Sequence, residues 1–204
     1  MPCLRRFLFS LLASMLLTLS AATARADVIT FNNDTQEIKP QPFQSIDSTL
    51  ATFSTSSSLS SLQVINFIGV SDGTNALFVP GPASDVLIIE FSTLVDSLSL
   101  DFGGDLVSDP QTTAILTLFL NGVQVGQTVM LTNHNGLVDQ TISFSGVLFN
   151  RATFSTALAS NPSCCFGEVV DNVTFTPVPE PATMVLLGFG LAGVAVKVRK
   201  RRNQ

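Results

Sequence analysis

Residues 112–131 read TTAILTLFL, then NG, then VQVGQTVML. Both flanks of Asn121-Gly122 are rich in β-branched and other apolar residues, a composition typical of strands. An Asn-Gly pair is a strong hairpin signal, because both central positions of a type I′ turn require a positive φ angle. The stretch therefore predicts two antiparallel strands, residues 112–120 and 123–131, joined by a two-residue turn.

Alternation of apolar and polar residues continues on both sides of this hairpin. Residues 97–102 carry Ser or Asp at the odd positions and Leu or Phe at the even ones. In residues 141–145, Ile142 and Phe144 alternate with Ser and Thr. A period of two places one side of a strand on a core and the other in water. Further strands are expected at 28–31, 62–70, 86–91, 146–149, 152–156 and 169–176.

These segments predict the fold class. Helical periodicity is absent before Ala182, and roughly ten short strands follow one another at regular spacing. The pattern predicts an all-β domain over residues 27–177, an antiparallel two-sheet β-sandwich of jelly-roll-like type. The chain has sixteen phenylalanines and neither Trp nor Tyr, so its core needs few polar partners. The sequence Ala-Thr-Phe-Ser-Thr occurs at 51–55 and 152–156, without the period of a repeat architecture.

The first twenty-six residues have the pattern of a secretory signal peptide with a signal helix. Arg5 and Arg6 precede an apolar segment, and Ala24 and Ala26 form a small-x-small cleavage site. We therefore expect the export translocon and signal peptidase to act on the chain, and the mature protein to begin at Asp27.

Charges are distributed unevenly along the chain. All fifteen acidic residues lie between Asp27 and Glu180, an interval that contains two basic residues, Lys39 and Arg151. Such a field repels nucleic acid and anionic surfaces and attracts cations. The sequence thus predicts an exported, self-repelling domain with no nucleic-acid partner.

The last residues form a different kind of segment. Pro179, Glu180 and Pro181 favour extended backbone. Residues 182–198 would form a helix of about 26 Å, close to the roughly 30 Å hydrocarbon core of a membrane. A basic cluster then marks the cytoplasmic side. It consists of Lys197, Arg199, Lys200, Arg201 and Arg202.

This order of motif, apolar helix and basic cluster resembles the PEP-CTERM sorting tail of exported bacterial proteins. The resemblance covers Val178 to Arg202 within a tail of residues 178–204. It implies processing by a membrane protease of the exosortase type and an association with exopolysaccharide. The protein would be held in the bacterial inner membrane with its C-terminus in the cytoplasm, and would then reach the cell surface or extracellular matrix. An ordinary C-terminal anchor is the alternative.

Cys164 and Cys165 are adjacent and would reach an oxidising compartment after export. We expect a strained bridge between them, with a bridge between chains or two free thiols as alternatives. A metal site is not expected, because neither a C-x-x-C spacing nor a histidine cluster accompanies the pair.

Acidic residues in loops raise the question of calcium, which prefers oxygen-rich, flexible sites. Asp101 and Asp105 lie at the Gly-Gly end of a strand. Asp171 shares strand parity with Val173, so a regular strand would point it inward, where a carboxylate needs backbone donors or a cation. A bulge that turns Asp171 outward is the alternative. The calcium candidates are Asp101, Asp105 and Asp171, with a solvated rim as the competing interpretation.

The function that these patterns favour is that of a non-enzymatic surface or matrix protein. The single histidine, His134, has no identifiable catalytic partner, and neither a His-Glu-x-x-His motif nor a phosphate-binding loop occurs. The first alternative is a carbohydrate-binding module, with or without calcium, which the absence of Trp and Tyr weakens. The second is a secreted hydrolase. No other cofactor is expected.

Overall fold

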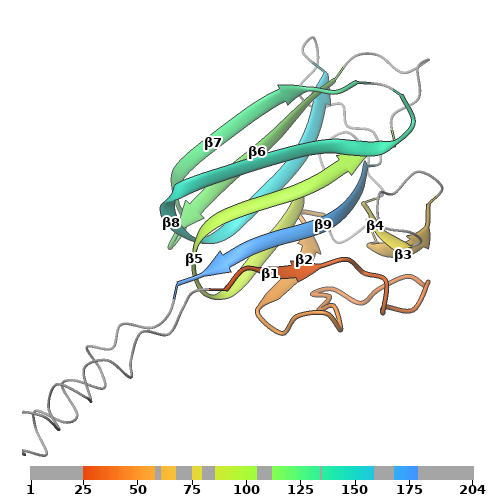
Figure 1. The fold of residues 1–204 in the computed structure, drawn as a ribbon, viewed down its shortest axis with the longest axis horizontal. Helices are drawn as coiled ribbons and strands as arrows, with labels where there is room; N and C mark the ends of the chain where they lie inside the picture. The colour runs from red at the N-terminus through yellow and green to blue at the C-terminus, as the bar shows by residue number, and fades with distance from the viewer. Residues whose placement is uncertain are drawn as a thin grey trace, which may run out of the picture. The chain divides into compact units, whose positions relative to one another are not determined.

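The computed structural model describes residues 25–57, 61–67, 75–79, 86–104, 112–133, 135–158 and 168–178. These residues belong to one compact unit and form nine β-strands, all paired antiparallel (Figure 1). In chain order the strands are β1 Asp27–Ile29, β2 Ala51–Thr55, β3 Gln63–Asn66, β4 Asn75–Val79, β5 Leu87–Gly103, β6 Thr112–Leu120, β7 Val123–Leu131, β8 Val138–Leu158 and β9 Glu168–Pro177. The prediction of an all-β antiparallel domain is confirmed.

The predicted hairpin is β6 and β7, with the expected bounds. Leu120 pairs with Val123 across a turn in which Asn121 has φ 51° and Gly122 has φ 83°. Both values lie in the left-handed region that a type I′ turn requires. The backbone N–H of Asn121 also donates to Asn150 Oδ1 of β8 at 3.0 Å, which ties the turn to the neighbouring strand.

Two strands are much longer than the sequence predicts. The segments 86–91 and 98–102 are parts of the 17-residue strand β5, and the three segments expected between 141 and 156 are parts of the 21-residue strand β8. The register between β5 and β8 shifts near Val95, and Gly146 has φ 90°. These irregularities interrupt the period of two that identifies a strand in a sequence, but they bend the strands without ending their pairing.

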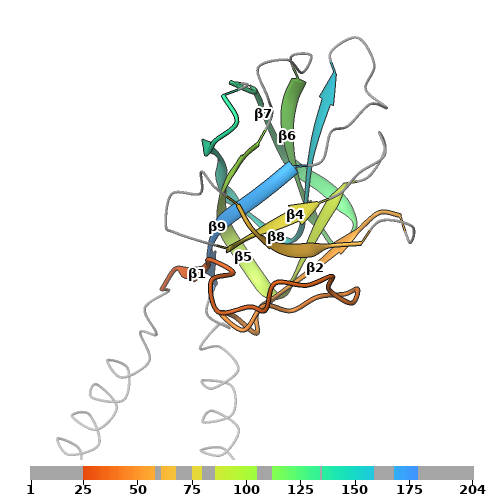
Figure 2. The same cartoon turned by 90° about the vertical axis from the view of Figure 1, so that its right-hand side faces the viewer.

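The bends fold one continuous sheet into two layers. The strand order is β3-β4-β9-β5-β8-β6-β7, with β1 beside β9 and β2 beside β5. Residues 87–91 of β5 pair with β2, whereas residues 95–103 pair with β9. The sequence predicts two separate sheets, but here the layers share β5 and β8. Figure 2 shows the strands of both halves around a common interior.

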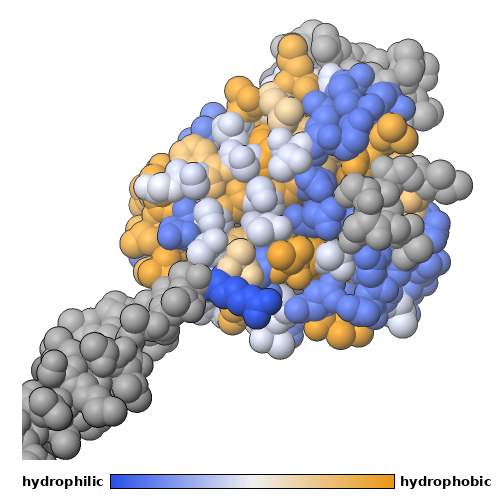
Figure 3. Space-filling model, in the orientation of Figure 1, coloured by the Kyte–Doolittle hydropathy of each residue, from blue (hydrophilic) through white to orange (hydrophobic). Residues whose placement is uncertain are grey.

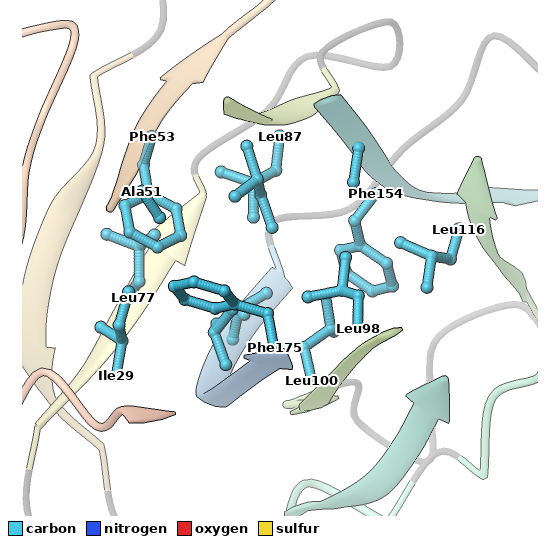
Figure 4. Close-up of a cluster of buried hydrophobic side chains, with 14 of the residues drawn as sticks. Ile29, Ala51, Phe53, Leu77, Leu87, Leu98, Leu100, Leu116, Phe154 and Phe175 are labelled. Carbon is cyan, nitrogen blue, oxygen red and sulfur yellow. The ribbon is translucent and has the colours of Figure 1, made fainter. Parts of the chain in front are cut away.

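Side chains from both layers meet in that interior (Figure 4). The Phe102 and Phe154 rings lie 5.2 Å apart between centroids, although the two residues pair with different neighbours. Phe91 and Phe175 lie 4.9 Å apart. Each fully buried phenylalanine contributes about 1.5–3 kcal/mol through the area it removes from water. The core therefore holds the two halves of the folded sheet together.

The repeated pentapeptide has a structural explanation. Ala51–Thr55 forms β2, the copy at 152–156 lies in β8, and the two flank β5 on opposite sides. Phe53 pairs with Ile89, and Phe154 pairs with Leu87. Both phenylalanines are buried in the same core. The two identical sequences thus have the same pattern of buried residues and pair with the same strand, β5.

A connecting segment between β1 and β2 is held by one carboxylate. Oδ2 of Asp47 accepts hydrogen bonds from the Thr30 N–H (2.9 Å), the Thr30 hydroxyl (3.0 Å) and the Phe31 N–H (3.0 Å). Oδ1 accepts from Asn33 Nδ2 at 2.7 Å. Phe31 has φ 58°, and these bonds hold it in that conformation while its side chain stays in the core. Burial raises the pKa of Asp47, but the hydrogen bonds from Asn33, Thr30 and Phe31 outweigh it and hold the pKa below its ordinary value.

We expect Asp47→Asn to lower the free energy of unfolding at pH 7 by about 1 kcal/mol, because the lost hydrogen bonds go to a partly exposed charged group. A carboxyl whose pKa is depressed by folding stabilises above its unfolded pKa, and this contribution is lost as the pH falls through the folded pKa. The difference between the two proteins should therefore shrink from pH 7 to pH 3 in urea titrations. Asp96→Asn is the control that removes an equal charge from β5. A difference that stays constant with pH would contradict the role given to Asp47.

Candidate functional site

A set of polar side chains covers the outer side of three neighbouring strands. In Figure 3, residues of near-neutral hydropathy, drawn pale, spread over the region where β8, β5 and β9 run. We call this surface the hydroxyl face. It consists of Ser97, Ser99 and Asp101 of β5, Thr141, Ser143 and Ser145 of β8, and Asn172, Thr174 and Thr176 of β9.

Strand register arranges these side chains in rows. Ser97 lies between Ser145 and Thr176, and Ser99 lies between Ser143 and Thr174. The intervening residues, such as Leu98 and Leu100, are buried in the core. Neighbouring strands are about 4.8 Å apart and alternate residues on one strand about 6.7 Å apart, so the polar groups form a regular array. Alternation in the sequence predicts the polar sides of residues 97–102 and 141–145, and strand pairing places both beside the polar side of β9.

Asp101 is the one charged residue of the hydroxyl face, and it is held on both sides. Its Oδ1 accepts a hydrogen bond from the Thr141 hydroxyl at 2.6 Å, and its Oδ2 accepts from Asn172 Nδ2 at 3.0 Å. Asn172 has φ 47° and lies where the register between β5 and β9 shifts. The resulting bulge places the Asn172 amide beside Asp101. The carboxylate is therefore fixed in position at one end of the face.

Asp171 is buried, but its parity with Val173 does not hold in the structure. It is 0 % exposed, whereas its register partner Asp101 is partly exposed. The bulge at Asn172 separates Asp171 from Val173, which lies in the main core. Because directly paired residues lie on the same side of a sheet, the register places the two carboxylates on the same side.

The calcium candidates do not form a site within the described chain. Asp105 lies outside the described residues, and Asp101 and Asp171 are register partners on neighbouring strands. Among the residues that the structure describes, no three His, Cys, Asp or Glu side chains gather closely enough to hold a metal ion. Calcium binding stays a prediction.

Several other predicted residues lie outside the described ranges. They are Ala24, Cys164, Cys165, Pro179, Glu180, Pro181, Lys197, Arg199, Lys200, Arg201 and Arg202, together with most of the signal segment and the whole expected helix 182–198. Within the described ranges, no helix is long and apolar enough to cross a membrane. Ala26 is described and immediately precedes β1.

The structure does describe where the domain ends. Pro177 of β9 pairs with Val95, and the Val178 N–H donates to the Leu94 carbonyl at 2.8 Å. The backbone is thus held to the residue directly before Pro179. Pro179, Glu180 and Pro181 therefore follow directly after the hydrogen bond between Val178 and Leu94.

A catalytic motif occurs in the connection between β3 and β4. Residues 69–73 read Gly-Val-Ser-Asp-Gly, which fits the nucleophile pattern Gly-x-Ser-x-Gly. In hydrolases that pattern joins a strand to a helix. Here it joins β3 to β4, which pair antiparallel, and residues 68–74 lie outside the described chain. The surrounding topology does not match the hydrolase context.

Comparison with protein families identifies the C-terminal segment. Residues 177–202 match the PEP-CTERM protein-sorting motif. This segment of the chain therefore carries a C-terminal protein-sorting motif of the PEP-CTERM type. A comparison with curated proteins finds no match.

Several solved structures resemble the domain at low sequence identity. An arabinose-bound MgGH51 α-L-arabinofuranosidase is 14% identical with a TM-score of 0.49, over 78% of this chain and 27% of that chain. A DUF4465 family protein from Bacteroides caccae is 11% identical with a TM-score of 0.46, over 76% of this chain and 100% of that chain. The CBM22-1 xylan-binding domain of Paenibacillus barcinonensis Xyn10C is 9% identical with a TM-score of 0.46, over 78% of this chain and 99% of that chain. The chain thus spans about a quarter of the arabinofuranosidase.

We expect Gly103→Ala to destabilise the domain strongly, because a Cβ on Gly103 would lie 2.0 Å from the Leu137 carbonyl oxygen. Overpacking of this kind costs about 1–3 kcal/mol or more, and backbone cannot move aside as a side chain can. Gly122→Ala is the matched control, since a Cβ there meets nothing within 4 Å and the cost is the left-handed conformation alone, about 1–2 kcal/mol. Thermal unfolding should show the larger loss for Gly103→Ala. Equal losses would mean that the close approach to Leu137 relaxes without cost.

Proposed function

We propose that this protein is a non-enzymatic exported protein whose C-terminal tail is a processing signal for an exosortase-type membrane protease. The observation that carries the proposal is the match of residues 177–202 to the sorting motif. This match begins at the last residue of β9. In this proposal the β-domain is the part of the protein that is exported, and the segment that follows it is the sorting signal.

Three segments of the chain act in succession during export, membrane retention and cleavage. Residues 1–26 direct the chain to the export translocon, and signal peptidase cuts after Ala26. The helix 182–198 then holds the precursor in the inner membrane, with the basic cluster on the cytoplasmic side. Cleavage around Pro179-Glu180-Pro181 releases the domain to the cell surface or to an extracellular matrix that contains exopolysaccharide.

The length of chain at the junction constrains the processing step. Val178 is tied to Leu94, and Pro179, Glu180 and Pro181 separate it from the start of the expected helix at Ala182. Three extended residues reach at most about 10 Å. The protease that we propose would thus act close to the folded domain, and the rigid Pro-Glu-Pro segment presents its backbone in extended form.

We expect Glu180→Ala and Pro181→Ala to leave full-length precursor in the inner-membrane fraction of the native host. Loss of the recognised side chain or of the fixed backbone would prevent cleavage, which intact mass and cell fractionation would detect. Glu168→Ala, a substitution of another acid near the C-terminal end, is the control and should mature normally. Normal maturation of both motif variants would contradict the proposal.

A second function, the binding of neutral polysaccharide, is favoured by the hydroxyl face. Sugar rings present many hydroxyl groups, and the rows of Ser, Thr, Asn and Asp side chains offer donors and acceptors at regular spacing. The face has one carboxylate and no base, so an uncharged glycan fits its electrostatics better than an anionic one. Without Trp or Tyr on the chain, hydrogen bonds rather than ring stacking would carry the contact.

We expect Ser143→Arg to weaken retention on an insoluble neutral polysaccharide, because a long charged side chain would stand in the middle row. Thr52→Arg on the outer side of β2 is the control and should not change retention. Affinity electrophoresis over a panel of neutral and anionic polysaccharides, with calcium or with EDTA, measures the effect. Equal mobility of the wild type in every gel would exclude glycan binding, and binding that EDTA leaves unchanged would exclude a calcium-dependent form.

A further inference from the structure

Some strand edges of the domain are covered by its own chain. At β3, the Lys39 N–H donates to the Leu62 carbonyl at 2.8 Å and the Val64 N–H donates to the Glu37 carbonyl at 3.0 Å. At β2, Phe43 and Phe53 exchange two backbone hydrogen bonds of 2.8 and 2.7 Å. The segment between β1 and β2 thus caps two edges. Covering an edge in this way prevents pairing with another chain.

The first half of β8 is an edge of a different kind. Residues 138–149 pair with β5 on one side, and no described strand pairs with the other. Asp139 brings an exposed charge to this edge, and Gly146 interrupts its regular backbone with φ 90°. Charge and irregularity both disfavour the addition of a strand.

Among the described residues, the edge of β7 from Gly126 to Met130 has neither kind of protection. It ends the strand order, and from Gly126 to Leu131 its register with β6 is regular. The Thr132 N–H points at β6, since it donates to the Thr112 carbonyl at 3.1 Å. Backbone groups alternate in direction along an antiparallel strand. Those of Gln127 and Val129 therefore point away from β6, as do those of Leu131, whose carbonyl accepts from Gln140 Nε2 at 3.0 Å.

The side chains along this edge are uncharged, and two of the exposed ones are apolar. Val129 is 57% exposed and Leu131 is 60% exposed. No Asp, Glu, Lys or Arg occurs between Asp109 and Asp139, so the whole β6–β7 hairpin is uncharged in a domain rich in acids. Two copies of such a domain repel each other least where this hairpin is brought together.

We propose that β7 is the self-association edge of this protein, pairing antiparallel with β7 of a second copy. With a two-fold axis at Thr128, Gln127 lies opposite the partner's Val129 and exchanges two backbone hydrogen bonds with it, and the reverse pair does the same. One self-complementary strand is sufficient for a closed C2 dimer. The uncharged edge favours a second copy as the occupant, because two acidic domains meet there without facing charges. This pairing does not depend on the sorting function.

The test uses residues 27–178, which contain every described strand and the whole described core. Sedimentation equilibrium under reducing conditions measures the dimer without any contribution from Cys164 or Cys165. We expect a reversible dimer, and Val129→Lys should weaken it at least tenfold because the two introduced lysines would lie diagonally across the axis with their like charges close together. Ile46→Lys, at a residue that is 70% exposed in the segment between β1 and β2, is the matched control and should dimerise as the wild type does.

A charge-swap variant tests the register. In Gln127→Lys/Val129→Glu, each introduced base lies opposite the introduced acid of the other copy, so this variant should dimerise more strongly than Val129→Lys alone. Unchanged circular dichroism and melting temperature show that the variants fold. A wild type that is monomeric at hundreds of micromolar, or a Val129→Lys dimer of wild-type strength, would overturn the proposal. A folded but monomeric double variant would overturn the register.

Discussion

The pairing of β5 with β8 is the constraint on which the rest of the structure depends. It runs from Leu87 opposite Phe154 to Gly103 opposite Val138. Because both strands bend together near Val95, their hydrogen bonds continue from one layer of the fold into the other. The remaining strands attach to one half or the other of this pair. A separate pair of sheets would be held by side chains alone, whereas this fold has backbone hydrogen bonds between its layers as well.

Bending also decides how the two sides of each strand are used. The inner sides of both layers meet in a phenylalanine-rich core, where Phe102 contacts Phe154 and Phe91 contacts Phe175. On the outer side of β8, β5 and β9, small hydroxyl groups form rows that end at Asp101. Bulges at Asn172 and near Val95 adjust the direction of single residues without disturbing the core. The same irregularities therefore shape both the fold and the candidate binding surface.

Much of the local structure could be predicted from sequence because local steric rules govern it. Asn121-Gly122 specifies its turn through positive φ angles, and alternation at 97–102 separates core from solvent. The parity of Asp171 with Val173 could not be read from sequence, because the bulge at Asn172 lies between them. The merging of predicted strands into β5 and β8 could not be predicted, since a bulge removes the periodicity that marks a continuous strand. The hydroxyl face is missed for another reason: its rows join residues from strands that are far apart in the chain.

The sequence by itself determined the all-β class, the β6–β7 hairpin and the sorting motif at 177–202, because each depends on neighbouring residues and their spacing. Tertiary structure alone decided which strands lie side by side and which edges are covered. It placed both copies of Ala-Thr-Phe-Ser-Thr beside β5 and left β7 at the end of the order. Strand partners are chosen by the packing of the whole core. That packing is a sum over contacts between residues distant in sequence, so no single stretch specifies it.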